Sequence, residues 1–481
     1  MSRNQKTSTV FFIILCLLFI ILTFPLMATG EKEKAKEEEP TLVWVHHYLG
    51  GLNPEGDKVW IDALYKKTGI RIKIIKPTES EYQTKVASML ATGEQIDLLY
   101  VDPDQFATLT KDNPDLFEPL DERIKKSPIL SDTKKFPKSA WDTIRQEDGH
   151  IYGTQPAVGL AAGGTLPIVR WDWVEKLGFA SKFEGNKKPT LDDYYELLKA
   201  FAYNDPDGNG KKDTYGIALG YTTYEMNPFF GAYGMLRDYA KDKDGKIYSP
   251  VTQDAAKPIW EYFQRLYREK ILEPNFVTNK SATFRELFMT GKVGMICYWD
   301  NWVPRLNDIV KSKNPNSSFR ARAIYPPVGP EGKQLLRHGG GSYTAILRNS
   351  KYKDLAFKLL EFFSTDEGAM LGTAGVEGYD YNIVNGKIVF TEIGKKIGQN
   401  HGMKPAWNWK IPWEISPEWR EAMQILAEVP GDIQRYYGRN GDQWEEIVGI
   451  DAAKIIRGEV SVEEGLKSMR KRLKDMGLVD Y

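Results

Sequence analysis

Residues 42–101 read LVWVHHYLGGLNPEGDKVWIDALYKKTGIRIKIIKPTESEYQTKVASMLATGEQIDLLYV, and this stretch decides the fold class. Three short apolar or alternating runs in it predict strands, and the two segments between them carry apolar residues at helical spacing. Each helical segment ends at a glycine, Gly69 or Gly93, as is common just past a helix C-terminus. The predicted elements are strands at 42–45, 70–74 and 97–101 and helices at 57–67 and 82–93. This β-α-β-α-β order with short connections is typical of a mostly parallel sheet covered by helices, so it predicts an α/β fold.

The carboxyl ends of these strands are the expected place for a ligand. In open α/β sheets, ligands bind just beyond those ends. His46, His47 and Tyr48 follow the first strand, and Asp102 follows the third. We therefore predict Tyr48 and Asp102 as ligand contacts.

Composition and length indicate a large soluble protein. The 481 residues are 42% hydrophobic and 27% charged, as in ordinary globular proteins. The chain is too long for one small core, so two lobes are expected. Capping-box-like starts at Thr190 and Ser461 precede amphipathic patterns and predict two later helices. The formal net charge is zero, so nothing attracts a polyanion and no nucleic-acid partner is expected.

The N-terminus has the pattern of an export signal. Arg3 and Lys6 precede an apolar run at 10–22, and the small residues at 28–30 follow it. This order predicts a signal peptide at 1–30 and an exported protein, on the periplasmic or extracellular face of the cytoplasmic membrane. An uncleaved membrane anchor is the alternative, since the apolar stretch is about long enough to span a bilayer.

The segment that follows, 31–40, is charged and ends in proline, so we predict a flexible tether. Neither cysteine is placed to carry a lipid anchor or to form a stabilising disulfide. Cys16 lies inside the apolar run, and Cys297 is the only other thiol. One remaining cysteine cannot form an internal disulfide, and no thiolate metal cage is possible.

A loop rich in Asp, Asn and Gly has the spacing of a calcium site. A calcium loop carries oxygen ligands at positions 1, 3, 5, 7 and 9 and glycine at position 6. Counting from the first aspartate places Gly210 at position 6, but Gly216 stands at position 12, where a bidentate Glu is usual. We predict structural Ca²⁺ here, with an ion-free turn as the alternative. The predicted ligands are Asp205, Asp207, Asn209, the carbonyl of Lys211, and Asp213.

Six segments, in order along about residues 40–478, resemble elements of extracellular solute-binding proteins of the sugar-binding family 1 type. The nearest group consists of the larger lipoprotein-like and alginate-oligosaccharide-binding members. The segments are 67–70 with 91–97, 148–153 (DGHIYG), 170–178 (RWDWVEKLG), 205–216, 288–295 (FMTGKVGM) and 367–378.

The resemblance implies a two-lobed periplasmic-binding-protein fold with discontinuous lobes, a hinge and an interlobe cleft. We expect one lobe from 41–155 plus 290–344 and the other from 156–289 plus 345–481. The resemblance also implies a monomer that encloses a carbohydrate, closes over it and delivers it to the permease subunits of an ABC importer. Membrane association would then come through the transporter or through an uncleaved anchor.

A sugar site needs flat aromatic platforms and planar hydrogen-bonding groups, and this chain has 13 Trp and 25 Tyr. Local sequence favours three segments. The first follows a predicted strand at an expected lobe crossing, the second follows three glycines before a predicted crossing strand, and the third gathers three indoles in an irregular stretch. They contribute Trp299, Asp300, Asn301 and Trp302, then Ser342 and Tyr343, then Trp407, Trp409 and Trp413. Tyr224 and Glu377 complete the predicted ligand contacts.

An enzyme is not expected, because no HExxH, GxSxG, Walker or dinucleotide-binding motif is present. Three alternatives stay open. An exported polysaccharide hydrolase or lyase could use a carboxylate pair among Asp102, Asp300 and Glu377 in an aromatic cleft. A sugar-sensing subunit for a membrane kinase would look the same at the cleft, and a peptide ligand is also compatible.

Overall fold

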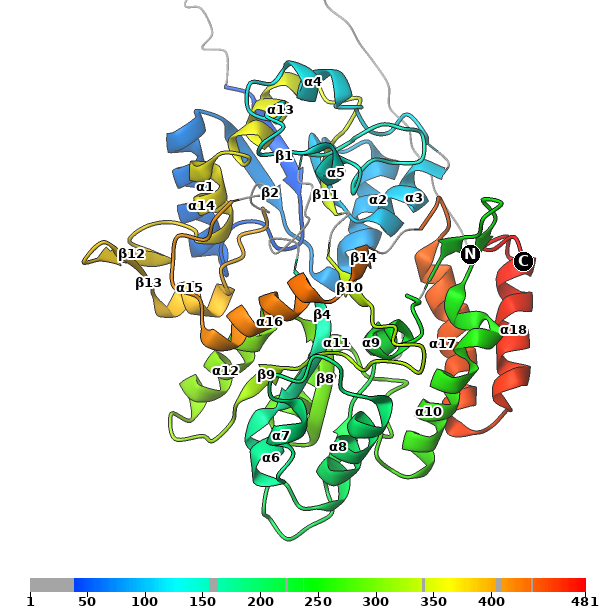
Figure 1. Ribbon diagram of the computed structural model, residues 1–481. Coiled ribbons are helices and arrows are strands. Elements are labelled where there is room, and N and C mark those ends of the chain that lie inside the picture. The colour runs from blue at the N-terminus through cyan, green and yellow to red at the C-terminus, as the bar shows by residue number, and fades with distance from the viewer. Residues whose placement is uncertain are drawn as a thin grey trace, which may run out of the picture. The chain divides into compact units, whose positions relative to one another are not determined.

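The predicted β-α-β-α-β unit is present and forms most of a four-stranded sheet. The computed structural model describes residues 39–481, except 112, 155–162, 221–223, 237, 340–341, 404–408 and 434–435 (Figure 1). The predicted signal peptide, most of the tether and Trp407 therefore lie outside the described residues. In this first sheet the order is β11-β3-β1-β2; β1 is parallel to β2 and β3, and β11 is antiparallel to β3. Its strands are β1 (Thr41–Val45), β2 (Arg71–Ile75), β3 (Leu98–Val101) and β11 (Tyr343–Ile346).

The two predicted helices of this unit begin and end for local reasons. The side chain of Asn53 accepts a hydrogen bond from the Gly56 amide at the start of α1, satisfying one of the free amides there. Both helices end at glycines in the left-handed region, Gly69 and Gly93, each with φ of 68°. The helices and turns grouped with the first sheet (Figure 1) are α1 (Pro54–Thr68), η1 (Glu79–Glu81), α2 (Tyr82–Thr92), α3 (Pro103–Lys111), α4 (Asp121–Lys126), α5 (Lys138–Trp141), α13 (Lys353–Phe362) and α14 (Asp366–Thr373).

A second sheet has the order β14-β10-β4-β8-β5, with β9 also pairing with β4. All seven residues of β4 are buried, as expected of a strand covered on both faces. Leu166 and Ile168 pack into one core with Ile296, whereas Val169 packs into the other with Met295. The strands are β4 (Gly164–Arg170), β5 (Tyr215–Ile217), β8 (Val293–Trp299), β9 (Ala321–Ala323), β10 (Leu336–His338) and β14 (Gly431–Ile433).

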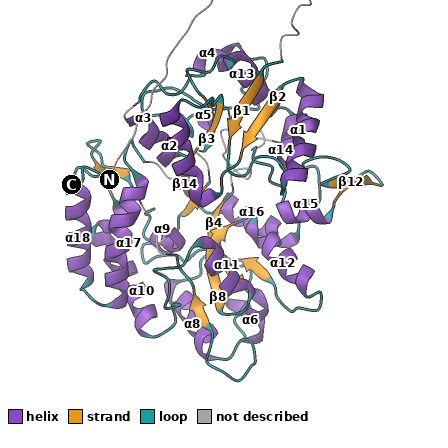
Figure 2. Ribbon diagram, turned by 180° about the vertical axis from the view of Figure 1, so that it is seen from behind, coloured by secondary structure: helices purple, strands orange, loops and turns teal. Residues whose placement is uncertain are grey.

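Helices cover both faces of this second sheet, and Figure 2 shows them from behind. The capping boxes predicted at Thr190 and Ser461 are both confirmed. In the described part of the chain, no helix is long and apolar enough to cross a membrane. The helices are α6 (Trp171–Lys176), α7 (Ala180–Phe183), α8 (Leu191–Tyr203), η3 (Tyr224–Met226), α9 (Asn227–Gly231), η4 (Pro250–Thr252), η5 (Asp254–Ala256), α10 (Lys257–Arg268), α11 (Ser281–Met289), α12 (Trp302–Lys313), α16 (Pro417–Glu428), α17 (Gly441–Arg457) and α18 (Val462–Asp475). Two hairpins, β6 (Ala240–Lys241) with β7 (Ile247–Tyr248) and β12 (Tyr381–Val384) with β13 (Lys387–Phe390), and helix α15 (Glu392–Ile397) complete the fold.

The grouping of the C-terminal half differs from the predicted lobes. Residues 290–344 were expected with the first sheet, but β8 and β10 pair with β4 in the second sheet. Residues 345–481 were expected with the second, but α13 and part of α14 share the core of the first sheet. The reason is that strand pairing is a long-range property, so the apolar run 293–299 carries no local signal for its partner. The chain passes from one sheet to the other between β10 and β11, near Ser342, whereas β8, which ends at Trp299, lies within the second sheet.

Candidate ligand-binding site

Five aromatic rings meet where β1 and β3 end. His46, His47 and Tyr48 follow β1, Tyr100 lies in β3, and Tyr82 begins α2. Ring centroids are 4.4 Å apart for His46 and Tyr100, 4.5 Å for His47 and Tyr48, and 4.9 Å for His47 and Tyr82. Mostly edge-to-face contacts of this kind hold rings at fixed angles. We call these five residues the first aromatic group.

Hydrogen bonds fix the first aromatic group to its sheet. The Tyr82 hydroxyl lies within hydrogen-bond distance of two backbone carbonyl oxygens. The carbonyl oxygen of Tyr100 is 2.7 Å away and that of Val45 is 3.1 Å away. The Tyr100 ring lies 5.4 Å from that of Tyr48, and polar interactions with Tyr48 and Ser342 lower the pKa of Tyr100 against the effect of burial. Burial raises the pKa of both Tyr48 and Tyr100, so both hydroxyls stay protonated at neutral pH. Ser342 thus lies beside Tyr100, which in turn contacts Tyr48.

The loop that carries His46, His47 and Tyr48 is anchored from a distant segment. His401 is fully buried, and its Nδ1 lies 2.8 Å from the carbonyl oxygen of Gly50. The ring of His46 in turn contacts the carbonyl of Gly402, with Nε2 at 3.1 Å. Burial lowers the pKa of His401 to about 4 and that of His47 to about 4, so both rings are neutral at pH 7.

A second aromatic group lies at the ends of β8 and β10. Arg337 lies over two rings, with its Cζ 4.6 Å from the centroid of Tyr224 and 5.4 Å from that of Trp299. On the opposite face of β8, the ring of Tyr298 contacts that of Trp302 at 5.5 Å. Tyr224, Tyr298, Trp299 and Trp302 form this second aromatic group.

The two groups are electrostatically coupled although they belong to different sheets. Asp102 caps α3 by accepting a 2.7 Å hydrogen bond from the amide of Gln105. Burial raises the pKa of Asp102, and the positive charge of Arg337 opposes that shift. Of the predicted contacts, Tyr48, Asp102 and Ser342 thus lie at or near the first aromatic group, and Tyr224 and Trp299 lie beside Arg337.

Two predicted contacts have structural roles instead. Asp300 is 2% exposed, and both carboxylate oxygens are used: one accepts from the Gly164 amide at 3.0 Å and the other from the Trp419 indole at 2.8 Å. Tyr343 is 1% exposed, and its ring packs directly against Gly153. We therefore exclude Asp300 and Tyr343 from the proposed ligand contacts. Asn301 is exposed just before α12.

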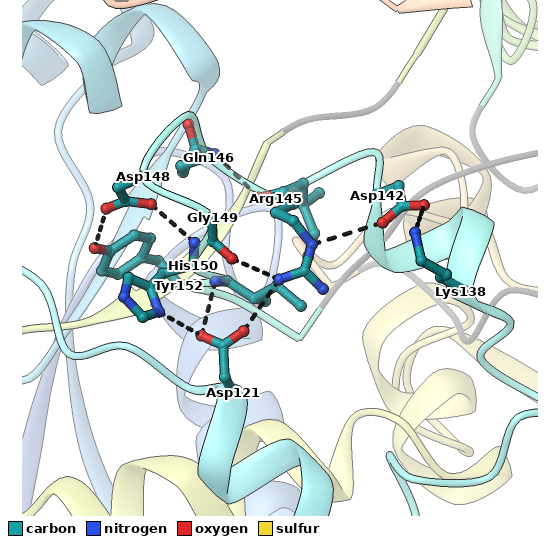
Figure 3. A network of polar contacts seen from close by, with 11 residues as sticks. Asp121, Lys138, Asp142, Arg145, Gln146, Asp148, Gly149, His150 and Tyr152 are labelled. Carbon is teal, nitrogen blue, oxygen red and sulfur yellow. Dashed lines mark hydrogen bonds and ion pairs between the residues drawn. The ribbon is translucent and has the colours of Figure 1, made fainter.

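The motif at 148–153 is also structural, and Figure 3 shows why. Asp148 accepts from the Tyr152 hydroxyl at 2.6 Å and from the His150 amide at 2.9 Å. Arg145 donates to the carbonyl of Gly149 at 2.6 Å and to Asp121 at 3.1 Å. Gln146, in the same network, donates to the Tyr343 hydroxyl at 3.1 Å. This loop thereby fixes β11, the strand that follows the crossing.

The remaining predicted contacts lie elsewhere. The rings of Trp409 and Trp413 are 5.7 Å apart, and Trp413 also packs against Phe390 of β13. Glu377 is exposed and bridges to Tyr381 at the start of β12. No described contact joins these three residues to either aromatic group, so the structure gives them no shared site.

The predicted calcium loop has its oxygen-bearing side chains gathered around Asn209. Its side-chain amide donates to Asp207 at 2.8 Å and to Asp213 at 3.1 Å, and its backbone amide donates to Asp205 at 3.0 Å. Lys292 holds the other Asp213 oxygen at 2.8 Å. Over the described residues, no group of three or more His, Cys, Asp or Glu side chains is arranged to hold a metal ion. The atoms predicted to ligate the metal are all oxygens, which suits Ca²⁺. Position 12 of the loop, Gly216, offers no carboxylate.

Sequence reasoning missed several residues of these groups. Tyr82 was assigned to a helix face and Tyr100 to a strand interior. Arg337 was missed because it lies in the middle of β10, two residues before the three glycines at 339–341, and nothing local marks it as a site residue. The available signal was periodicity, because Tyr100 is two residues before Asp102 and so lies on the same face of the strand.

The described part of the chain also has hollows that do not coincide with the aromatic groups. One of about 900 Å³ is lined by α10 and the α17–α18 connection, including Tyr267, Arg457 and Glu464. Another of about 380 Å³ is lined by Phe106 and Tyr152 of the first sheet's region and by Tyr436 and Tyr437.

Comparison with known proteins agrees with this architecture. The chain is 25% identical to lipoprotein LipO of Bacillus subtilis strain 168 over 386 residues, which is 76% of this chain and 71% of LipO. It is 30% identical to the polygalacturonan/rhamnogalacturonan-binding protein YtcQ of the same organism over 247 residues, or 49% of this chain and 46% of YtcQ. Among solved structures, the alginate-binding protein AlgQ2 without calcium ion superimposes with a TM-score of 0.67 at 18% identity, covering 92% of this chain and 96% of AlgQ2. FusA of S. pneumoniae in complex with kestose gives 0.64 at 17% identity, covering 91% and 96%.

These structural likenesses confirm the two-lobed α/β fold class. The model of bacterial extracellular solute-binding proteins matches residues 60–381, two thirds of the chain. This chain belongs to the family of bacterial extracellular solute-binding proteins.

Proposed function

We propose that this protein captures an oligosaccharide outside the cytoplasmic membrane and delivers it to an ABC importer. The observation that carries the proposal is the pair of aromatic groups. They come from two different sheets and lie at strand ends, and Asp102 and Arg337 couple them. Rings on both sides suit the flat faces of sugar rings, and hydroxyl and guanidinium donors suit their hydroxyl groups. YtcQ and FusA, whose names describe proteins that bind carbohydrates, are relatives of this chain.

In this proposal the two sheets are the cores of two lobes, and the chain between β10 and β11 is part of the hinge. Ligand contacts to both aromatic groups would favour a closed form, because a ligand shifts an equilibrium only by binding one state better. The permease would recognise that form. The family and the likeness to lipoprotein LipO support export.

The positions of the candidate carboxylates favour a protein that binds its sugar without cleaving it. Hydrolysis by a carboxylate pair needs two carboxyl groups facing one scissile bond. Both oxygens of Asp300 are engaged by protein donors, and Glu377 is exposed beside the β12 hairpin. Asp102 is left without either of the two partners named for it.

Titration calorimetry against a panel of oligosaccharides, followed by chromatography of the recovered sugars, tests the proposal. We expect one-to-one binding of at least one oligosaccharide, with the sugar recovered intact. Cleaved products would identify an enzyme. No binding to any carbohydrate, with binding to peptides, would also contradict the proposal.

We further propose that Ca²⁺ binds at Asp205–Asp213 as a structural ion. The alternating oxygen donors support it, and relatives include AlgQ2, described without calcium ion, and FusA with an EF-hand mutant. The residues would hold the ion through Asp205, Asp207, Asn209, the Lys211 carbonyl and Asp213.

A further inference from the structure

Two arginines share one indole ring in the second aromatic group. The Cζ of Arg285, on α11, lies 4.0 Å from the ring centroid of Trp302, and that of Arg305, on α12, lies 4.3 Å from it. Arg285 also lies over Tyr298, at 4.9 Å, and contacts its hydroxyl. Within the described residues, no carboxylate lies within 4.0 Å of either guanidinium. Both side chains are partly exposed, so their remaining N–H groups can meet a ligand.

Four other arginines that lie over aromatic rings in this protein have acidic partners. The contacts are 2.6 Å for Arg123 with Asp354, 2.6 Å for Arg170 with Asp172, 3.0 Å for Arg265 with Glu269 and 2.6 Å for Arg322 with Glu421. Stacking therefore does not by itself explain why Arg285 and Arg305 lack a counter-charge.

Without an acidic partner in the described part of the chain, the like charges of Arg285 and Arg305 destabilise the folded protein. Burial lowers the pKa of Arg305, and the like charge of Arg285 lowers it further. The Nε of Arg305 is buried and has no hydrogen-bond partner among the described residues. Half-buried charges and buried donors are normally paired, and violations of this rule concentrate at functional sites.

The third arginine at this end of the sheet repeats the pattern. Arg337 stacks on Tyr224 and Trp299, and its Nε is also buried without a partner in the described part of the structure. Burial lowers its pKa, and Asp102 attracts it without forming an ion pair within 4.0 Å. Within the described residues, Arg285, Arg305 and Arg337 thus all lie over aromatic rings near the end of β8 without an ion pair within 4.0 Å.

We infer that the oligosaccharide is anionic and that Arg285 and Arg305 bind its acidic groups. This inference rests on the proposed function. The aromatic contacts fix the position of each guanidinium, and its partly exposed N–H groups match the planar oxygens of a carboxylate. The sugar that carries the acid would then lie beside Trp302 and Tyr298, next to the two guanidinium groups. A uronate carboxylate and a sulfate ester share this chemistry.

The test compares three oligosaccharides of equal length by titration calorimetry: a galacturonate oligomer, a sulfated galactan oligomer and a neutral galactan oligomer. The wild type is measured beside Arg305→Gln, Arg285→Gln and the control Arg265→Gln, which removes a stacked but paired arginine. We expect an anionic oligomer to bind roughly 10-fold or more tightly than the neutral one, since a charged hydrogen bond is worth about 1.5–3 kcal/mol. Which anionic oligomer binds more tightly identifies the acidic group.

Arg305→Gln and Arg285→Gln should each abolish that preference, whereas Arg265→Gln should retain it. The unliganded melting temperature of Arg305→Gln should not fall, because the residue has no ionic partner to lose. Equal affinity for neutral and anionic oligomers would overturn the inference and leave the proposed function standing. A preference that survives both substitutions would also overturn it, and binding to none of the three nor to any other oligosaccharide would contradict the proposed function itself.

Discussion

Replacing His401 with asparagine should change how the stability of this protein depends on pH. His401 is 0% exposed and holds the carbonyl of Gly50 through Nδ1 at 2.8 Å. Its Nε2 is buried and has no hydrogen-bond partner in the described residues. Asparagine can supply an N–H toward Gly50, but it cannot take up a proton.

The magnitude follows from the lowered pKa of the ring. Burial takes the pKa of His401 from 6.5 to about 4. Between these values the unfolded chain binds a proton that the folded chain does not, so stability falls as the pH falls through 6.5 toward 4. Each pH unit in this window costs about 1.4 kcal/mol, so the loss from this residue is about 2 kcal/mol at pH 5.

Urea unfolding of the wild type and His401→Asn at pH 7 and pH 5 measures this effect. The variant should be less stable at pH 7, because it loses buried ring contacts, and the gap should shrink by about 2 kcal/mol at pH 5. The carboxylate of Asp380 lies 3.7 Å from Nε2 of His401, so its titration is coupled to the ring, and the same measurements in an Asp380→Asn background isolate the histidine. The control is His150→Asn, at a side chain that is 51% exposed. A gap of the same size at both pH values would refute the buried neutral histidine.

Three further predictions concern the site, the ion and the packing. Tyr100→Ala should weaken oligosaccharide binding by roughly 10-fold, as an aromatic contact is worth about 1 kcal/mol or more, and Trp302→Ala should weaken it similarly; unchanged calorimetric affinities in both would show that the platforms were misidentified. Added Ca²⁺ should raise the melting temperature of the wild type but not of Asp207→Ala, and an equal rise in both would place the ion elsewhere. Gly153→Val should cost roughly 1–3 kcal/mol or more in urea unfolding, because a Cβ there would lie 2.4 Å from the Tyr343 ring; wild-type stability in this variant would argue against the close packing of that strand.

Local elements of the first sheet could be predicted from the sequence because their causes are local. The run at 42–45, the alternation at 70–74 and the glycine stops reflect burial and backbone freedom within a few residues. The partner of β8 could not be predicted in this way. Its apolar residues would suit either sheet, and the pairing with β4 joins segments more than a hundred residues apart.

The site was predictable to the extent that it follows strand ends. Tyr48, Asp102 and Trp299 were found because ligands lie beyond such ends. Asp300 looked like a ligand group beside Trp299, but the distant Trp419 takes one of its oxygens. Arg285 and Arg305 carry no local signal, because they come from two helices and only the fold brings them to Trp302.

A crystal structure of the protein with a bound oligosaccharide tests the central claim most directly. The account predicts sugar rings in contact with Tyr48 or Tyr100 on one side and with Trp299 or Trp302 on the other. A sugar bound instead in the 900 Å³ hollow beside Tyr267 and Glu464, or one touching the residues of a single sheet only, would contradict it.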